Sequence, residues 1–254
     1  MLNNFGTDGG AGPQYEFLPN ADTAVTVQFK REISKEVNRY VTALADIIAG
    51  GGIDGITETV PTFTSLTVFY DCSVIRAAEL REKLAEIIRT MSSGESGSAK
   101  VYHIPVCYDE KFALDMNNVC EHTGLTAEEI IKIHTSSPYL IYMLGFLPGF
   151  AYLGGLDERI ATPRLKSPRL EIFEGAVGIG GNQTGIYPIA SPGGWQLIGK
   201  TPVKVFDLKR EKPILYEAGD YIEFYPVTLE KYNEIEKQIE NGGFEVKVTE
   251  VRDA

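Results

Sequence analysis

The feature that most constrains this chain is a block rich in glycine and proline between residues 145 and 199. It holds 12 of the 26 glycines and five of the 13 prolines. Such density is typical of short strands joined by turns. Runs typical of strands also occur at 139–146, 203–207 and 221–227. The second half of the chain is therefore predicted to form a closed or nearly closed all-β domain.

The glycines of this block allow two interpretations. Backbone N–H groups of glycine-rich segments converge on anions, and the missing Cβ lets a ligand approach the chain closely. A barrel with tight corners needs the same glycines only for positive φ. The residues alone do not decide between an anion site and a purely structural role.

One string in the block matches a phosphate-binding pattern. Residues 194–201, GWQLIGKT, fit G-x-x-x-x-G-K-[ST] letter for letter. A phosphate-binding loop needs a helix that begins at the lysine, so that its first N–H groups face the phosphates. Pro202 to Phe206 is typical of a strand instead. The match is therefore interpreted as accidental.

The first hundred residues alternate between strand and helix patterns. Strands are expected at 24–29, 56–60, 66–70 and 100–108, and helices at 36–49 and 77–91. This β-α-β-β-α-β order matches the split βαβ, ferredoxin-like unit. The predicted fold class is α+β, with a flexible tail at 1–19, a small α/β domain at 20–100 and a β-barrel domain at 101–254. Within the barrel domain, helices are expected at 116–123, 126–134 and 229–240, with a last strand at 244–248.

Composition excludes several classes of partner. Lys and Arg number 24 against 35 Asp and Glu, and the net charge of −11 repels nucleic acid and anionic membranes. The uncharged run 133–156 has the length of a membrane span, but Pro148 and four glycines would leave backbone hydrogen bonds unmet there. Three cysteines without C-x-x-C spacing and an N-terminus without a secretory signal predict a cytoplasmic protein with no metal site.

Five ordered strings resemble one known family. They are Ile104-Pro-Val-Cys107, Glu121-His-Thr-Gly124, GFLPGFAYLGGL at 145–156, GNQTGIYP at 181–188 and SPGGWQLIGKTP at 191–202. Together they resemble the family of the B-type subunit of 5-oxoprolinase, also called the KipI family or allophanate hydrolase subunit 1. The carboxyltransferase subdomain C/D of urea amidolyase shares its fold. The resemblance covers about residues 20–230 and implies a cyclophilin-like β-barrel for the C-terminal domain.

The resemblance also implies a function. Such a chain would belong to a complex that uses ATP, with Mg²⁺, to open 5-oxo-L-proline to L-glutamate, together with a homologous C-type subunit, and with an A-type subunit as well. A second hypothesis is a KipI-like inhibitor that binds a sporulation histidine kinase. A third is a subunit of an allophanate- or urea-amidolyase-type complex. A cyclophilin-like fold does not itself imply prolyl isomerase activity.

Under the enzyme hypothesis, the glycine-rich block is expected to bind the substrate and phosphate. A lactam carbonyl is a poor electrophile, and its activation by ATP requires fixed donors around developing negative charge. The expected donors to a phosphate or carbonyl oxygen are the backbone of Gly180 and Gly181 and the side chains of Gln183 and Thr184. Arg164 or Arg169 is expected to bind a carboxylate or phosphate in a bidentate way. The expected pocket lining is Tyr187, Ser191 and Trp195.

Each of these residues has a structural alternative. The two arginines also suit surface ion pairs with Glu171, Glu174 or Asp157. The aromatic residues Tyr187 and Trp195 also suit the core of a barrel. His122, at the end of an expected helix, is either a general base or a cap favoured by the helix dipole.

Overall fold

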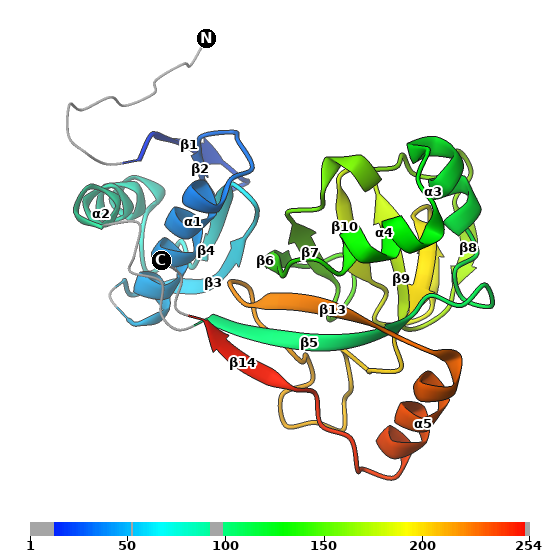
Figure 1. The fold of residues 1–254 in the computed structure, drawn as a ribbon. Helices are drawn as coiled ribbons and strands as arrows, with labels where there is room; N and C mark the ends of the chain where they lie inside the picture. Colours follow the sequence, from blue (N-terminus) through cyan, green and yellow to red (C-terminus); the bar gives the residue numbers. More distant parts are fainter. Residues whose placement is uncertain (1–12, 52, 92–98, 252–254) are drawn as a thin grey trace. The chain divides into compact units, whose positions relative to one another are not determined.

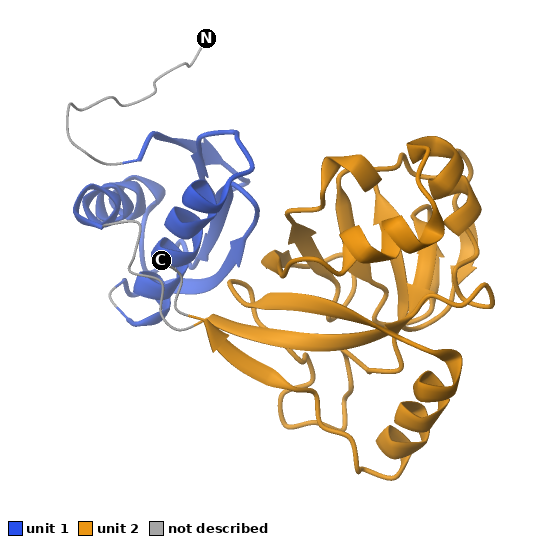
Figure 2. Cartoon of the chain, in the orientation of Figure 1, with its two compact units in different colours: residues 1–97, 254 blue, residues 98–253 orange. Residues whose placement is uncertain are grey.

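A computed structural model describes residues 13–51, 53–91 and 99–251. The chain divides into two compact units, Met1–Gly97 and Ser98–Asp253 (Figure 2). Residues 1–12 of the expected tail lie outside the described residues. Each unit has a hydrophobic core of its own.

The first unit is an antiparallel sheet with two helices. Its strands are β1 (Tyr15–Pro19), β2 (Ala24–Phe29), β3 (Ile56–Pro61) and β4 (Ser65–Tyr70), and its helices are α1 (Lys35–Ala49) and α2 (Ala77–Thr90). The sheet order is β1-β2-β4-β3. Val25 and Val27 alternate with half-buried polar residues along β2, so one face of the sheet is apolar. That face packs with Leu44 of α1 and Leu84 of α2. The Ser34 hydroxyl caps α1 by accepting from the Val37 N–H at 3.3 Å.

Two expectations for this unit are wrong. Tyr15–Pro19 was expected within the tail 1–19 but forms β1, which pairs with β2. The strand expected at 100–108 is β5 (Ala99–Cys107), and it lies in the second unit. β5 is buried on both faces over most of its length, which fits a covered barrel wall rather than a sheet edge. β1 therefore takes the edge beside β2, and a ferredoxin-like unit is not confirmed.

The second unit is a closed β-barrel, as the sequence predicts (Figure 1). Its sheet runs β12-β9-β10-β7-β6-β13-β5-β14, and an additional pairing of Lys200 with Cys107 joins β12 to β5. Seven strands thus form the ring and β14 extends it beyond β5. The ring strands are β5, β6 (Tyr139–Leu144), β7 (Ala151–Gly154), β9 (Ala176–Gly180), β10 (Gln183–Ile186), β12 (Gln196–Lys200) and β13 (Tyr221–Val227). The cyclophilin-like label stays a prediction.

Short elements surround the ring. They are α3 (Met116–Thr123), α4 (Ala127–His134), η1 (Glu158–Ile160), α5 (Leu229–Glu240), the small sheet β8 (Arg169–Ile172) with β11 (Ser191–Gly193), and β14 (Val248–Val251). In Figure 1, α3 and α4 lie on one side of the barrel and α5 on another.

Two expected elements of the second unit differ from the structure. The strand expected at 203–207 is wrong, because the segment contributes only an isolated bridge between Phe206 and Ile214. The last strand, expected at 244–248, begins only at Val248. The strand expected at 139–146 is confirmed as β6, and the rest of the uncharged run 133–156 contains the end of α4 and β7. No helix among residues 13–51, 53–91 and 99–251 combines the length and apolar character needed to cross a bilayer.

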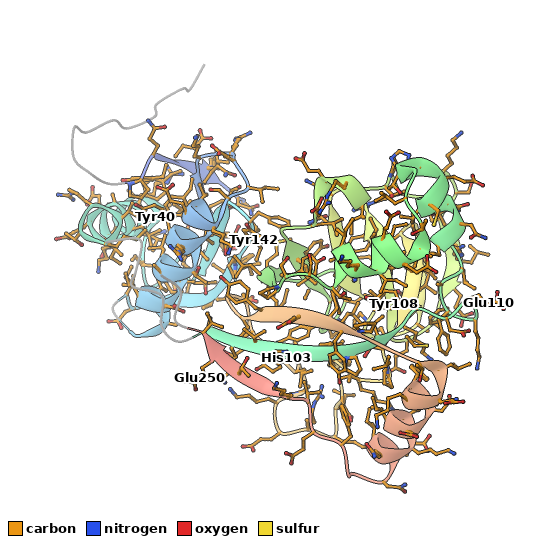
Figure 3. The ribbon with its side chains drawn as sticks, in the orientation of Figure 1. Tyr40, His103, Tyr108, Glu110, Tyr142 and Glu250 are labelled. Carbon is orange, nitrogen blue, oxygen red and sulfur yellow. The ribbon has the colours of Figure 1, made fainter. Side chains whose placement is uncertain are left out.

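A buried histidine joins α4 to the barrel. His134 is fully buried and stacks on Phe224 at a ring distance of 4.8 Å. Its Nδ1 lies 2.7 Å from the hydroxyl of Tyr108, which directly follows β5 (Figure 3), and its Nε2 lies 2.8 Å from Thr184 Oγ1. The Thr184 hydroxyl donates to the Gly178 carbonyl at 3.0 Å, so His134 donates from Nε2 and accepts from Tyr108 at Nδ1. Burial lowers the pKa of His134 to about 3, which keeps the ring neutral.

This arrangement predicts a pH dependence of stability. The pKa of His134 is about 3 when folded and about 6.5 when unfolded, so the unfolded chain binds more protons between these values. The free energy of unfolding should therefore fall by about 1.4 kcal/mol per pH unit as pH drops from about 6 to about 4. Urea unfolding followed by the fluorescence of Trp195, the single tryptophan, measures it in the second unit.

The His134→Gln variant separates this effect from general acid sensitivity. The glutamine amide of this variant replaces both hydrogen bonds of the histidine ring and does not titrate. The free energy of unfolding should therefore lose most of its slope of about 1.4 kcal/mol per pH unit. The control, Thr184→Val, removes one partner and should lower stability at every pH with the slope retained. Equal slopes for the parent and His134→Gln would contradict the prediction.

Candidate functional site

An aromatic pocket of about 110 Å³ opens on the barrel unit. Phe150 is its centre, since its ring makes edge-to-face contacts with Tyr152, Tyr187 and Trp195 at centroid distances of 5.3–5.6 Å. The full lining of this aromatic pocket is Phe146, Phe150, Tyr152, Arg164, Tyr187, Gly193, Gly194 and Trp195. The pocket is therefore a small cage of rings with one cationic side chain at its border.

Glycines of the barrel wall and of the small sheet beside it make room for the rings. A Cβ on Gly180 would lie 2.4 Å from Nε1 of Trp195, and a Cβ on Gly193 would lie 2.5 Å from the hydroxyl oxygen of Tyr187. Neither distance is tolerable between heavy atoms. Glycine at these positions thus serves close packing of aromatic rings on backbone, a third role beside the two that the sequence left open.

A second hollow, the polar cleft, adjoins the first. Its volume is about 600 Å³, and its lining is Asn118, Glu121, His122, Thr162, Pro163, Arg164, Leu165, Lys166 and Gln196. Arg164 lines both hollows, and its Cζ lies 5.8 Å from the centre of the Trp195 ring. This is a cation–π distance, so the guanidinium connects the aromatic pocket to the polar cleft.

A hydrogen-bond network fixes the floor of the polar cleft. Asp115 is 3% exposed; its Oδ2 accepts from the Leu197 N–H and its Oδ1 from Arg169 Nη2, both at 2.7 Å. Asn118 donates to Gln196 Oε1 at 3.4 Å, and Gln196 Nε2 donates to the Pro163 carbonyl at 2.9 Å. The backbone beside Arg164 is therefore held by β12 and α3.

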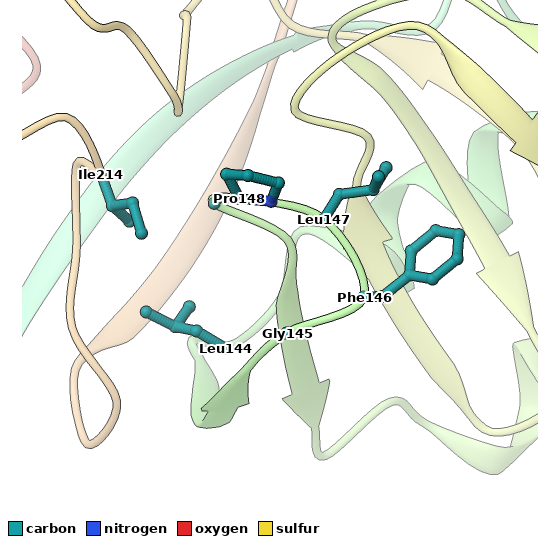
Figure 4. Close-up of a pocket in the computed structure, with 7 residues that line it drawn as sticks. Leu144, Gly145, Phe146, Leu147, Pro148 and Ile214 are labelled. Carbon is teal, nitrogen blue, oxygen red and sulfur yellow. The ribbon is translucent and has the colours of Figure 1, made fainter. Parts of the chain in front are cut away.

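A third hollow, of about 340 Å³, lies at the turn between β6 and β7 (Figure 4). Leu144, Pro148 and Ile214 are among its apolar lining residues, and no charged side chain is among the seven residues that line it. Phe146 borders this hollow and the aromatic pocket, is 65% exposed and has a φ of +62°. Without a polar group to orient a ligand, the hollow is a weaker candidate than the other two.

The structure brings four predicted site residues to these hollows. Arg164, Tyr187 and Trp195 line the aromatic pocket, and His122, in the last turn of α3, lines the polar cleft with Arg164. Burial raises the pKa of Tyr187, while a hydrogen bond from the Trp195 backbone and the charges of Arg164 and Arg169 lower it in part. The Tyr187 hydroxyl is therefore protonated at neutral pH and suits a hydrogen-bonding role.

The other predicted residues line neither the aromatic pocket nor the polar cleft. Gly180, Gly181, Gln183 and Thr184 form a β-hairpin between β9 and β10. The Gly181 N–H donates to the Thr162 carbonyl at 2.8 Å, and Thr184 is fully buried against His134. The Gly181 N–H and the Thr184 hydroxyl are therefore not available to a phosphate.

Arg169 and Ser191 lie in the small sheet of β8 and β11. Arg169 pairs with Asp115 rather than with Glu171, Glu174 or Asp157. Its Nη1 and the Ser191 Oγ are buried without a hydrogen-bond partner among the described residues.

Sequence reasoning missed several residues of the site. Phe150 and Tyr152 lie in the string 145–156, whose aromatic content was a usable signal. Asp115, Asn118 and Gln196 act through contacts distant in sequence, and no local pattern marks them.

Curated relatives match nearly the whole chain. The B-type subunit of 5-oxoprolinase from Bacillus subtilis is 42% identical over 87% of this chain and 96% of its own length. Its counterpart from Escherichia coli O157:H7, also a B-type subunit of 5-oxoprolinase, is 36% identical over 81% of this chain and 93% of its own. The urea amidolyase of Lachancea kluyveri is a more distant relative, 24% identical, and this chain spans 15% of it.

Solved structures agree with the fold. A conserved uncharacterized protein from Pyrococcus horikoshii is 40% identical, with a TM-score of 0.51 over 85% of this chain and 100% of its own. The crystal structure of TTHA0988 gives a TM-score of 0.71 at 33% identity over 80% of this chain, which spans 40% of that protein. The K. lactis urea amidolyase gives 0.79 at 22% identity over 94% of this chain and 16% of its own, a likeness in fold.

Fold and hollows define an α+β protein of two units whose closed barrel carries an aromatic pocket beside a polar cleft. The chain belongs to the family described as carboxyltransferase domain, subdomain C and D, which matches residues 15–216, and within it to the group of the B-type subunits of 5-oxoprolinase.

The Asp115 network generates a stability prediction. Asp115→Asn keeps an acceptor for Leu197 but removes the charge that neutralises Arg169. Breaking a buried ion pair costs about 3–5 kcal/mol, and the part-exposed Arg169 side chain reduces this, so a loss of about 1–3 kcal/mol is expected. The control is Asp157→Asn at the surface pair Asp157–Arg159, with a loss below about 1 kcal/mol. Chemical unfolding measures both, and equal losses would contradict a special role for Asp115.

Proposed function

We propose that this chain is the B-type subunit of an ATP-dependent 5-oxoprolinase that opens 5-oxo-L-proline to L-glutamate, active with partner subunits. The observation that carries the proposal is the aromatic pocket, where Arg164 stands beside the cage of rings around Phe150. The family membership and the names of three curated relatives support it.

The pocket suits a small cyclic acid. 5-Oxoproline is a five-membered lactam with one carboxylate, and a hollow of about 110 Å³ matches a molecule of this class. The ring faces of Phe150 and Trp195 would contact its CH₂ groups, and the Arg164 guanidinium would bind the carboxylate by two parallel hydrogen bonds. The Tyr187 hydroxyl, protonated at neutral pH, would bind a ligand oxygen.

The reaction explains why such a site needs few reactive side chains. ATP is a co-substrate: its γ-phosphoryl group leaves ADP and bonds to the lactam carbonyl oxygen. Water then adds to the carbonyl carbon and the ring C–N bond breaks as nitrogen takes a proton. A second water releases phosphate, so one ATP and two waters are consumed per glutamate. This chain would hold the ring in place and stabilise negative charge, which fixed donors do without covalent chemistry.

No metal site is assigned to this chain. Among residues 13–51, 53–91 and 99–251, no three His, Cys, Asp or Glu side chains are grouped to hold a metal ion. Mg²⁺, which the resemblance implies, would enter with the nucleotide substrate.

Substitution of Arg164 tests the proposal in the assembled complex. Loss of a charge-assisted contact of about 1.5–3 kcal/mol should raise the KM for 5-oxoproline about 10- to 100-fold in Arg164→Gln. Arg159→Gln, the same charge change at an exposed pair with Asp157, is the control and should change KM less than about twofold. The measurement is glutamate release dependent on ATP and 5-oxoproline.

Two results would count against the proposal. An unchanged KM in Arg164→Gln would remove Arg164 from the substrate site. No turnover by a correctly assembled complex would reject the enzyme function and make binding to a histidine kinase the next assay.

A further inference from the structure

We infer that the polar cleft is a separate anion site that binds a phosphoryl group next to the aromatic pocket. The identity of the anion rests on the proposed function. The location of the anion site rests on the residues that line the cleft. It moves the phosphate site from the glycine hairpin at Gly180 and Gly181 to the side chains of His122, Arg164 and Lys166.

Three basic side chains line this cleft although the chain carries a net charge of −11. His122 comes from α3, while Arg164 and Lys166 come from the segment that precedes β8. None of the three has an ion-pair partner within the described parts of the chain. Glu121 is the one acidic residue among the nine that line the cleft. The local field therefore favours an anion.

The backbone that carries the two long cations is fixed in advance. Leu165 donates its N–H to the Gly194 carbonyl at 2.7 Å, and Thr162 exchanges two backbone hydrogen bonds with Gly181. Gln196, which is 6% exposed, donates a hydrogen bond from Nε2 to the Pro163 carbonyl at 2.9 Å. A site whose supporting backbone does not have to be ordered on binding keeps more of its interaction energy as affinity.

The number of donors indicates a phosphoryl group rather than a second carboxylate. One carboxylate is satisfied by the guanidinium of Arg164 alone. A phosphoryl group has three peripheral oxygens and up to two negative charges, so it needs donors beyond the two that Arg164 gives to the carboxylate, and His122 and Lys166 line the same cleft. Because Arg164 borders both hollows, an anion in the cleft would lie beside a lactam in the aromatic pocket.

The test uses the full chain with inorganic phosphate as the probe and acetate at equal ionic strength as the comparison. Calorimetry should show phosphate binding that weakens about tenfold or more in Lys166→Gln and in Arg164→Gln. Lys209→Gln, the same charge change at an exposed lysine that lines neither hollow, should bind phosphate like the parent. In the assembled complex, Lys166→Gln should raise the KM for ATP about tenfold and that for 5-oxoproline less than about twofold.

Equal phosphate affinity in the parent and Lys166→Gln, with both chains folded by their unfolding midpoints, would overturn the inference. Phosphate binding no tighter than that of acetate would overturn it too. If phosphate binding depends on Lys166 but 5-oxoproline neither binds nor turns over, the anion site stands and the proposed function fails. If turnover occurs and phosphate binding ignores Lys166, the function stands and this site fails.

Discussion

The site depends on a steric constraint, the contact of one indole ring with bare backbone. Trp195 lies over Gly178, Gly180 and Gly185 of two neighbouring strands, where an added Cβ would come within 2.4–3.3 Å of its atoms. The indole in turn supports the ring of Phe150 and the guanidinium of Arg164. Any side chain at Gly180 would displace the indole ring, and the aromatic pocket would lose one of its walls.

Much of the barrel was predictable from the sequence, because glycine and proline density between residues 145 and 199 reports short strands and turns directly. The first unit was less predictable. Local patterns gave its helices and inner strands well, but periodicity does not say to which sheet a strand belongs, and β5 was therefore assigned to the wrong one. Pairing over long sequence distances, such as β2 with β4, is decided by tertiary packing.

The candidate site was predictable in residue type more than in grouping. Arg164, Tyr187 and Trp195 line one pocket, and their role toward a substrate stays a prediction. The glycine hairpin was misjudged because the sequence does not reveal that the Gly181 N–H already donates to the Thr162 carbonyl. The hydrogen bonds of Asp115 could not be predicted from local patterns, because its partners Arg169 and Leu197 lie 54 and 82 residues away in the sequence.

The strand order of the barrel also bears on how the chain folds during synthesis. β5 is the first barrel strand made, and its parallel partner β13 follows 120 residues later, from Val101 to Tyr221. At about 5–20 residues per second the ribosome needs roughly 6–24 s to supply that partner. The sheet of Met1–Gly97 pairs only strands of that unit, and all four of them have been synthesised by then. The first unit is thus free to fold while the barrel still waits for its closing strands.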